Sequence, residues 1–112
     1  MPAKPVRLSN GRFWPTKGEA ETHFKRMLGR YSVGQRVMDP IDHSDLAALI
    51  EIYDSVVLVG APTKSGVGID HFSKQTNRGE RWSTDGFHVH RTDGTAIDFS
   101  YGEALTVACN KA

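Results

Sequence analysis

Apolar residues recur at helical spacing early in the chain. The first stripe consists of Ala20, Phe24, Met27, Leu28 and Tyr31. These positions fall within about 80° of one another on a helical wheel, so they form one buried face. Thr16 precedes the stripe and Glu19 follows three residues later, which is the spacing of a capping box. The pattern therefore predicts a helix that begins after Thr16. His23 lies at the edge of the stripe, and we interpret it as a boundary residue.

A second, shorter stripe follows an irregular stretch. It consists of Leu46, Leu49, Ile50 and Tyr53. Gly34 and Pro40 interrupt the chain before it, so residues 32–42 cannot form a regular helix throughout. Asp42 is the predicted N-cap, and Asp45 lies in the first turn, where the helix dipole favours an acid. We expect a short second helix from Asp42.

The second half of the chain changes to alternation typical of strands. Strand patterns cover residues 68–76, 81–91 and 95–101, with turns at 77–80 and 92–94. Residues 6–14 predict a small hairpin around Asn10-Gly11, a pair that suits a type I′ turn. Residues 54–68 indicate an irregular connection with room for one short strand. The closing stretch, 102–112, predicts a final helical turn through Ala104, Leu105 and Ala108.

The sequence "TDG" at residues 92–94 selects the register of the last two strands. A two-residue loop would set Val89 opposite Asp98 and mix apolar with polar side chains on one face. A three-residue loop, with Gly94 left-handed in a G1 bulge, pairs Val89 with Ile97 instead. The same register pairs Phe87 with Phe99. We therefore predict an apolar core face on this hairpin, with His88 opposite Asp98 on the other face.

These elements predict a single α+β domain over residues 1–112. We expect an antiparallel sheet of three main strands plus an N-terminal strand or hairpin, with two helices packed on one face. The predicted core consists of Phe24, Met27, Leu28, Leu49, Phe72, Phe87, Val89, Ile97 and Phe99.

Composition narrows the class of protein. A chain of 112 residues with 38% hydrophobic and 24% charged residues is typical of one soluble globular domain. Its apolar runs are strand-sized, so no membrane association is expected, and the N-terminus lacks the apolar core of a secretory signal. The single cysteine, Cys109, excludes an intrachain disulfide and a cysteine zinc cage. A cytoplasmic location is the default expectation.

Charge is uneven although the net charge is only +1. Residues 1–30 hold seven Lys and Arg against two acids, whereas residues 31–63 hold one Arg against five acids. Residues 64–91 are mildly basic again. Such asymmetry can steer an anionic partner, although mixed surface charge also serves ordinary solubility.

The histidine pair in "FHVHR" allows two interpretations. His88 and His90 stand at i and i+2 on one strand, with Asp98 opposite and His71 on the neighbouring strand. Two imidazoles and a carboxylate can hold a divalent metal with open positions, as in hydrolytic sites. The same residues also form ordinary cross-strand pairs, worth a few tenths to about 1 kcal/mol. We favour sheet pairing, and we expect no metal and no cofactor.

Other catalytic chemistry has little support in the chain. Cys109 lies in a predicted tail without a base, so it is a poor nucleophile. The glycine-rich residues 66–68 lack the lysine and the following helix of a phosphate loop. An enzyme is therefore less favoured than a binding module.

Basic and aromatic residues cluster around the 74–81 hairpin and suggest contact with nucleic acid. The predicted contact residues are Lys74, Arg78, Arg81, Trp82, His88 and Arg91. Lys and Arg would neutralise phosphates, while Trp82 and His88 would stack on unpaired bases. Arg91 is the weakest candidate, because its side chain begins on the core face and can pair with Asp93 instead.

Three stretches resemble the DCL family, the defective-chloroplasts-and-leaves domain. They are "FWPTKGEAETHFKRMLGRY", "GVGIDHF" and "FHVHRTDGTAIDFSY", and the resemblance covers about residues 8–103. Members include plant organellar proteins connected with ribosomal RNA processing and a C-terminal domain of plant-specific RNA polymerase subunits. The resemblance implies a small α+β domain in an RNA or transcription setting, without an established enzyme activity.

The chain departs from the family pattern at two places. His88 and His90 stand where members carry aromatic or aliphatic residues, so a metal site there would be peculiar to this chain. Residues 52–65 replace a lysine-rich run and leave the end of the second helix open.

The hypothesis from sequence is a non-catalytic nucleic-acid-associated module that contacts RNA or a ribonucleoprotein. The first alternative is a metal-dependent hydrolase that acts through His88, His90 and Asp98. The second alternative is a protein-interaction domain without nucleic-acid contact.

Overall fold

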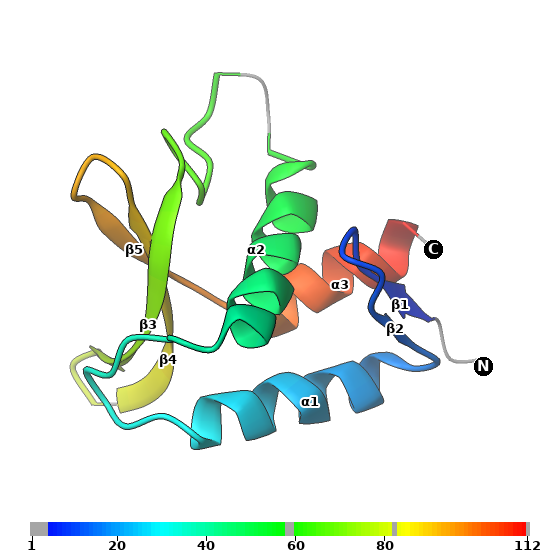
Figure 1. Cartoon of the computed structure of the whole chain (residues 1–112), viewed down its shortest axis with the longest axis horizontal. Helices are drawn as coiled ribbons and strands as arrows, with labels where there is room; N and C mark the ends of the chain where they lie inside the picture. The colour runs from blue at the N-terminus through cyan, green and yellow to red at the C-terminus, as the bar shows by residue number, and fades with distance from the viewer. Residues whose placement is uncertain (1–4, 58–59, 82, 112) are drawn as a thin grey trace.

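The computed structural model describes residues 5–57, 60–81 and 83–111 of the chain. In chain order the elements are β1 (Val6–Arg7), β2 (Phe13–Trp14), α1 (Lys17–Gly29), α2 (Pro40–Asp54), β3 (Ile69–Arg78), β4 (Ser83–Arg91), β5 (Ala96–Phe99) and α3 (Tyr101–Lys111). Figure 1 shows the helices on one side of the sheet formed by β3, β4 and β5. The predicted α+β class is confirmed, with a third helix in addition to the two expected.

The main sheet is antiparallel with the order β3-β4-β5, and its last hairpin has the predicted register. Val89 pairs with Ile97, and His88 pairs with Asp98. Arg91 N–H donates to the Thr95 carbonyl at 2.7 Å across the loop 92–94. Gly94 has a φ of +87°, which is the left-handed conformation of a G1 bulge. The hydrophobic pattern and the turn thus determine the same pairing.

The turn between β3 and β4 lies later than the sequence predicted. Pairing continues to Arg78 opposite Ser83, so residue 77 still belongs to β3 and does not start a turn. The hydrogen bond of Thr76 Oγ1 to Asp85 Oδ1, at 2.8 Å, supports this extension. Turn-forming residue types at 77–80 were therefore misleading, because cross-strand bonds keep Asn77 and Arg78 extended.

A further segment covers the outer edge of β3. Val37 N–H donates to the Phe72 carbonyl at 2.8 Å, and Lys74 N–H donates to the Gln35 carbonyl at 3.0 Å. Arg36 forms an antiparallel bridge with Ser73. Residues 34–37 thus pair with β3 and protect an edge that would otherwise expose free backbone groups.

The N-terminal hairpin is a separate two-stranded sheet and does not join the main one. Leu8 N–H donates to the Arg12 carbonyl, and Gly11 N–H donates back to the Leu8 carbonyl. Gly11 has a φ of +91°, while every described non-glycine residue, Asn10 included, has a negative φ. The expected type I′ turn was therefore wrong, because Ser9 to Gly11 form a three-residue loop with one left-handed glycine.

Helix α1 begins as its capping box predicted. Thr16 is the N-cap, and its Oγ1 accepts a hydrogen bond from Glu19 N–H at 3.1 Å. Ala20, Phe24 and Met27 of the apolar stripe are buried. The helix therefore presents one face to the core, as its periodicity indicated.

Helix α2 begins earlier than expected. Asp39 is the N-cap and Pro40 occupies the first turn, where proline needs no amide partner. The predicted cap, Asp42, is instead a buried side chain inside the helix. Asp42 was misassigned because Asp39-Pro40 is the stronger start signal. After Asp54 the described residues up to Gly68 form turns and bends, and residues 58–59 of the predicted short strand lie outside the described residues.

Helix α3 extends over eleven residues, where only a final turn was predicted. Ala104, Leu105 and Ala108 are buried in the core. Cys109 is also buried in this helix and does not lie in a tail. The apolar stripe of this segment is short and consists largely of alanine. The helix is therefore stabilised by its contacts with α1 and α2.

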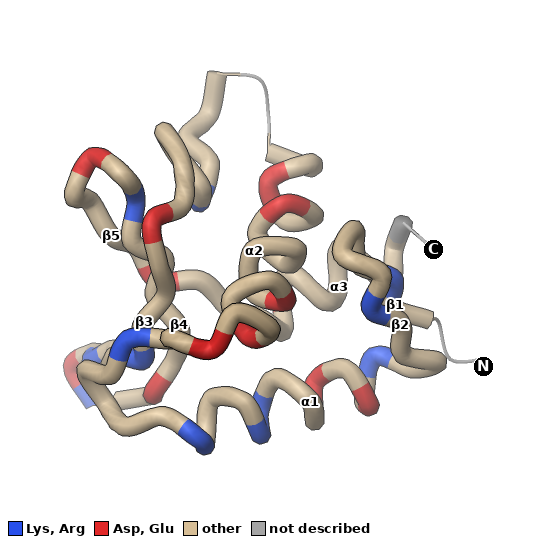
Figure 2. The backbone as a smooth tube through the Cα atoms, in the orientation of Figure 1, with Lys and Arg blue, Asp and Glu red and all other residues tan. Residues whose placement is uncertain are grey.

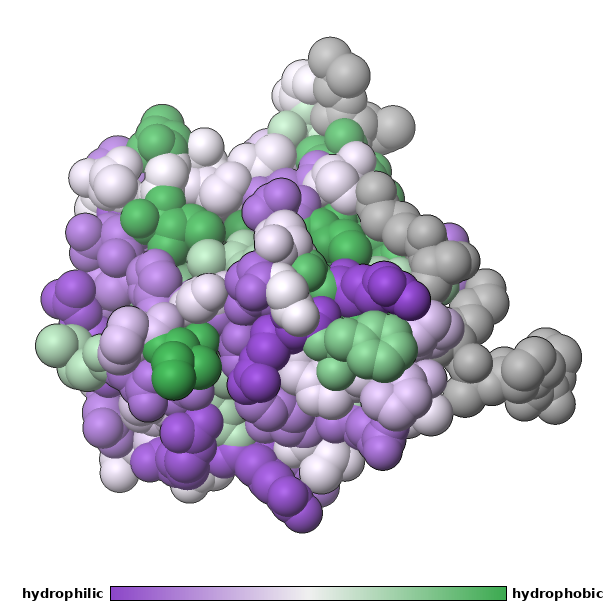
Figure 3. Space-filling model, turned by 45° about the vertical axis from the view of Figure 1, so that its right-hand side comes forward, coloured by the Kyte–Doolittle hydropathy of each residue, from purple (hydrophilic) through white to green (hydrophobic). Residues whose placement is uncertain are grey.

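The core joins the helices to the inner face of the sheet. Most of the predicted core is buried, while Leu28 and Ile97 are partly buried. Figure 3 shows exposed apolar side chains in separate groups among hydrophilic ones on the face in view. Among the described residues, no helix is long and apolar enough to cross a membrane.

Candidate nucleic-acid interface

Alternation along β3, β4 and β5 places polar side chains on the side of the sheet that faces away from the helices. We call this the outer face. Because directly paired residues share a face of the sheet, the register defines it. Its polar residues are Arg36, His71, Ser73, Gln75, Asn77, Thr84, His88, His90 and Asp98.

Two imidazoles on the outer face are stacked across strands. His71 and His90 are paired, with ring centroids 4.1 Å apart and planes inclined by 8°. His90 Nε2 is 2.7 Å from the hydroxyl of Ser73, which is itself buried. His71 Nδ1 contacts the carboxylate of Asp70. The contacts with Ser73 and Asp70 therefore fix the positions of the two rings.

His88 is the third imidazole of the outer face. Its Nε2 is 2.9 Å from Asn77 Oδ1, although its paired residue on β5 is Asp98. Burial lowers the pKa of His88, and the charge of Asp98 opposes this shift only partly. At neutral pH this ring is therefore uncharged and half-buried.

The pKa of His90 is also lowered. Burial is the main cause, and the neighbouring imidazoles of His71 and His88 lower it further, against the attraction of Asp70. At pH 7 the outer face thus presents neutral aromatic rings at these two positions, which favours stacking over charge pairing.

The geometry does not favour the metal interpretation of His88, His90 and Asp98. Within the described ranges, no group of three or more His, Cys, Asp or Glu side chains is arranged to hold a metal ion. The Nε2 atoms of His88 and His90 contact Asn77 and Ser73, so they do not converge on Asp98. The cross-strand arrangement is that of sheet pairing.

Three arginines lie near the edges of the sheet that carries the outer face. Arg36 lies beside Ser73 on the covering segment, whereas Arg78 and Arg81 lie at the end of the β3–β4 hairpin, and all three are exposed. No ion pair involves them within the part of the chain that the structure describes. Figure 2 shows basic segments around this hairpin and the end of α1, with a few acidic ones between.

Two of the predicted phosphate contacts make internal contacts instead. Lys74 Nζ donates to the carbonyls of Leu28, at 3.2 Å, and Tyr31, at 2.9 Å, so it caps the end of α1. Arg91 donates to the carbonyls of Thr63 and Lys64, both at 3.0 Å, and holds that loop. These cations bind backbone and are poorly placed to contact phosphate.

Of the predicted interface residues, His88 lies on the outer face, and Trp82 lies outside the described residues. Arg78 and Arg81 lie at the end of the hairpin, where Arg78 alternates with Asn77 and so belongs to the opposite face of β3. Arg36 and His71 belong to the outer face but were not predicted as contacts. Strand alternation in the sequence is a signal that could have placed His71 on the outer face. No sequence signal could have placed Arg36 there, because its segment carries no strand pattern.

Comparison with known proteins gives a family and a fold. The model of the family described as "Protein of unknown function (DUF3223)" matches residues 25–105. The solution NMR structure of an uncharacterized protein from Rhodospirillum rubrum is similar, with a TM-score of 0.72 and 27% sequence identity. The match covers 91% of this chain and 88% of that one. No curated protein matches the chain.

Proposed function

The chain belongs to this family of unknown function, and we propose that its domain is a non-catalytic module that binds single-stranded RNA, free or in a ribonucleoprotein. The observation that carries the proposal is the row of imidazoles formed by His71, His88 and His90 on the outer face. The helices cover the opposite face, so this row is open to a partner.

Unpaired bases bind proteins by stacking on flat side chains, imidazole included. Each stacked base contributes about 1–3 kcal/mol, with little sequence preference. Gln75 and Asn77 follow the rings along β3 on the outer face, towards the hairpin end, and carry amide groups that can bond base edges. A platform of rings and amides suits single-stranded RNA better than a duplex, whose bases are already stacked.

Arg36 supplies charge beside this platform, and Arg78 and Arg81 supply charge at the end of the hairpin that carries it. Exposed arginines bind phosphate oxygens and release condensed cations, so affinity falls as salt rises. Three phosphate contacts correspond to a slope of about −2 in a plot of log K against log salt for a single strand. Lys74 and Arg91 contribute little to this slope, because their donors bind backbone carbonyls.

The sequence resemblance supports the same setting. Residues 8–103 resemble DCL domains, which are connected with RNA processing and transcription, and we extend the proposal to membership of that family and to a cytoplasmic location. The metal-dependent hydrolase receives no support from the side-chain geometry.

Titration of fluorescently labelled single-stranded RNA at several salt concentrations tests the proposal. We expect binding with a slope near −2, and the Arg78→Ala, Arg81→Ala double variant should reduce the slope to about −0.7, the value for one remaining contact.

The matched control removes two cations from the other end of the molecule, by Arg7→Ala with Lys17→Ala. This variant should keep the wild-type slope. Absence of binding at low salt, or equal effects of the two double variants, would leave protein interaction as the better account of the outer face.

A further inference from the structure

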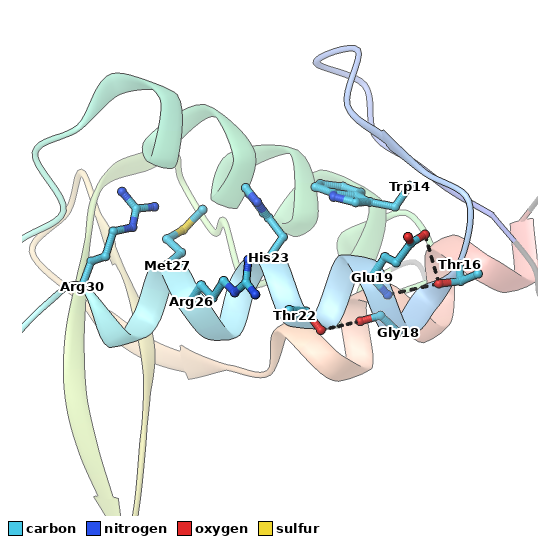
Figure 4. Close-up of a pocket in the computed structure, with 9 residues that line it drawn as sticks. All are labelled: Trp14, Thr16, Gly18, Glu19, Thr22, His23, Arg26, Met27 and Arg30. Atoms are coloured by element: carbon cyan, nitrogen blue, oxygen red, sulfur yellow. Dashed lines mark hydrogen bonds between the residues drawn. The ribbon is translucent and has the colours of Figure 1, made fainter.

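A groove of about 580 Å³ runs along α1, away from the outer face of the sheet. Figure 4 shows Arg30, Met27 and His23 projecting from the same side of the helix, in line with Trp14 of β2. Arg26 stands one turn before Arg30 and also lines the groove. The residues come from two elements, so the fold assembles this row.

A buried carboxylate holds Arg30 at one end of the groove. Asp42 is 3% exposed and accepts hydrogen bonds from Arg30 Nη2, at 2.9 Å, and from the Tyr31 hydroxyl, at 2.6 Å. The Arg30 side chain remains about half exposed, at 54%. Asp42 therefore orients the guanidinium, and the N–H groups that do not face Asp42 can bind a ligand.

A second buried carboxylate orders the middle of the groove. Asp45 is 1% exposed, and its Oδ2 lies 3.0 Å from His23 Nε2 and 3.1 Å from Arg12 Nη2. The Arg12 guanidinium in turn lies 5.7 Å from the centre of the Trp14 ring. Although burial opposes ionisation of Asp45, the hydrogen bonds from Arg12, Asn10 and His23 lower its pKa overall.

The ion pairs of Arg30 with Asp42 and of Arg12 with Asp45 add little net stability, because burial desolvates the two carboxylates while solvent screens the half-exposed guanidinium groups. They do fix the side chains that they hold, and a binding site gains affinity when its groups are fixed before the ligand arrives. Both pairs fix groups at or beside the same groove. This arrangement is the geometry of a prepared binding site.

The two ends of the groove differ in charge. Asp42 and Asp45 compensate Arg30 and Arg12, whereas Arg26 has no ion pair among the described residues. At the other end Glu19 is bonded to Thr16, beside the flat surface of Trp14. An anion is therefore favoured at the Arg26 end and disfavoured near Glu19, and a flat ring is favoured at Trp14.

We propose that this groove binds a nucleoside monophosphate, with its base against Trp14 and its phosphate at Arg26 and Arg30. Thr22 and His23 line the groove between the two ends, and Met27 lies buried beneath them. The site is separate from the outer face, so it does not depend on RNA binding there. Its ligand is either a free nucleotide or the phosphorylated end of an RNA strand.

Tryptophan fluorescence measures this binding directly. The chain has two tryptophans, and a Trp82→Phe background leaves Trp14 as the reporter. We expect AMP to quench Trp14 saturably, and adenosine to bind at least about tenfold more weakly, because it lacks the phosphate that forms charge-assisted hydrogen bonds. A short RNA with a 5′-phosphate that quenches Trp14 at concentrations tenfold or more below those needed for AMP and for the same RNA without the phosphate identifies the strand end as the ligand. Equal concentrations for the RNA with and without the phosphate identify the free nucleotide.

The decisive comparison is Arg26→Gln against Lys25→Gln, both at exposed positions of α1, of which only Arg26 lines the groove. Arg26→Gln should weaken AMP binding about tenfold, and Lys25→Gln should leave it unchanged. The Arg78→Ala, Arg81→Ala variant should also leave AMP binding unchanged, which separates this site from the outer face. Absence of saturable quenching at millimolar AMP, or equal effects of the two glutamine variants, would overturn the proposal.

Discussion

The three imidazoles of the outer face are each fixed by a different neighbour. His71 contacts Asp70, His90 contacts Ser73, and His88 contacts Asn77. A ring that is already held loses less conformational freedom when a partner binds. The outer face is therefore prepared for flat ligands at the level of single side chains.

Acid should destabilise the fold through His88 and His90. The pKa of each is lowered from 6.5 by burial, so below pH 6.5 the unfolded chain binds more protons than the folded one. Stability should therefore rise with pH through the window below 6.5 and level off above it. Urea denaturation at pH 7.5, 6.5 and 5.5 measures this dependence.

The double variant His88→Gln, His90→Gln is the control for this pH effect. Glutamine keeps a hydrogen-bonding group at both positions but does not titrate, so the variant should show a flatter profile over the same window. An unchanged profile would assign the effect to other groups.

At the scale of elements, Lys74 joins the sheet to the end of α1. Its ammonium group donates to two carbonyls in the segment that closes the helix, where a cation also complements the helix dipole. Lys74→Met keeps the aliphatic stem but removes both bonds, and should lower the free energy of unfolding by about 1–2 kcal/mol. Chemical denaturation measures the loss.

Arg78→Met provides the comparison on the same strand. Arg78 is exposed at the end of β3, so its replacement should change the free energy of unfolding by less than about 0.5 kcal/mol. If both variants lost equal stability, Lys74 would not be acting as a helix cap.

Elements were predicted correctly where capping or turn residues mark their boundaries in the sequence. Thr16 and Glu19 locate the start of α1, and Gly94 with the flanking apolar residues determines the register of β4 and β5. The full length of helix α3 and the edge segment 34–37 were missed, because neither has a strong pattern of its own. Both depend on neighbours that are distant in the sequence.

Contacts between residues distant in the sequence also explain why some site residues were predicted wrongly. Lys74 and Arg78 are alike in sequence, yet Lys74 binds carbonyls 43 and 46 positions away while Arg78 stays exposed. Arg91 similarly binds a loop 27 and 28 positions away. Sequence patterns located the basic hairpin but could not distinguish structural cations from exposed ones.

At the scale of the molecule, α3 closes the side of the core that α1 and α2 leave open. It contacts both helices, and Leu105 is fully buried in it. Leu105→Ala should lower the free energy of unfolding by about 2–5 kcal/mol, since it removes a buried side chain and leaves a cavity. That loss is a large part of the total stability of a small domain.

Thr106→Ala is the adjacent control for this prediction. Thr106 is exposed, and its hydroxyl bonds only a carbonyl of its own helix, so the change should be within about 0.5 kcal/mol. Thermal denaturation of the two variants compares them. A small loss for Leu105→Ala would mean that α3 is not part of the cooperative core.

The central claim, that single-stranded RNA binds the outer face, is tested most directly by NMR of the histidine rings. The chain has five histidines, three on the outer face and two elsewhere, His23 beside Trp14 and His43 against Phe72. We predict that an RNA strand without a terminal phosphate shifts the ring signals of His71, His88 and His90 and leaves those of His23 and His43 unchanged. Shifts confined to His23 and His43, or none at saturating RNA, would contradict the account.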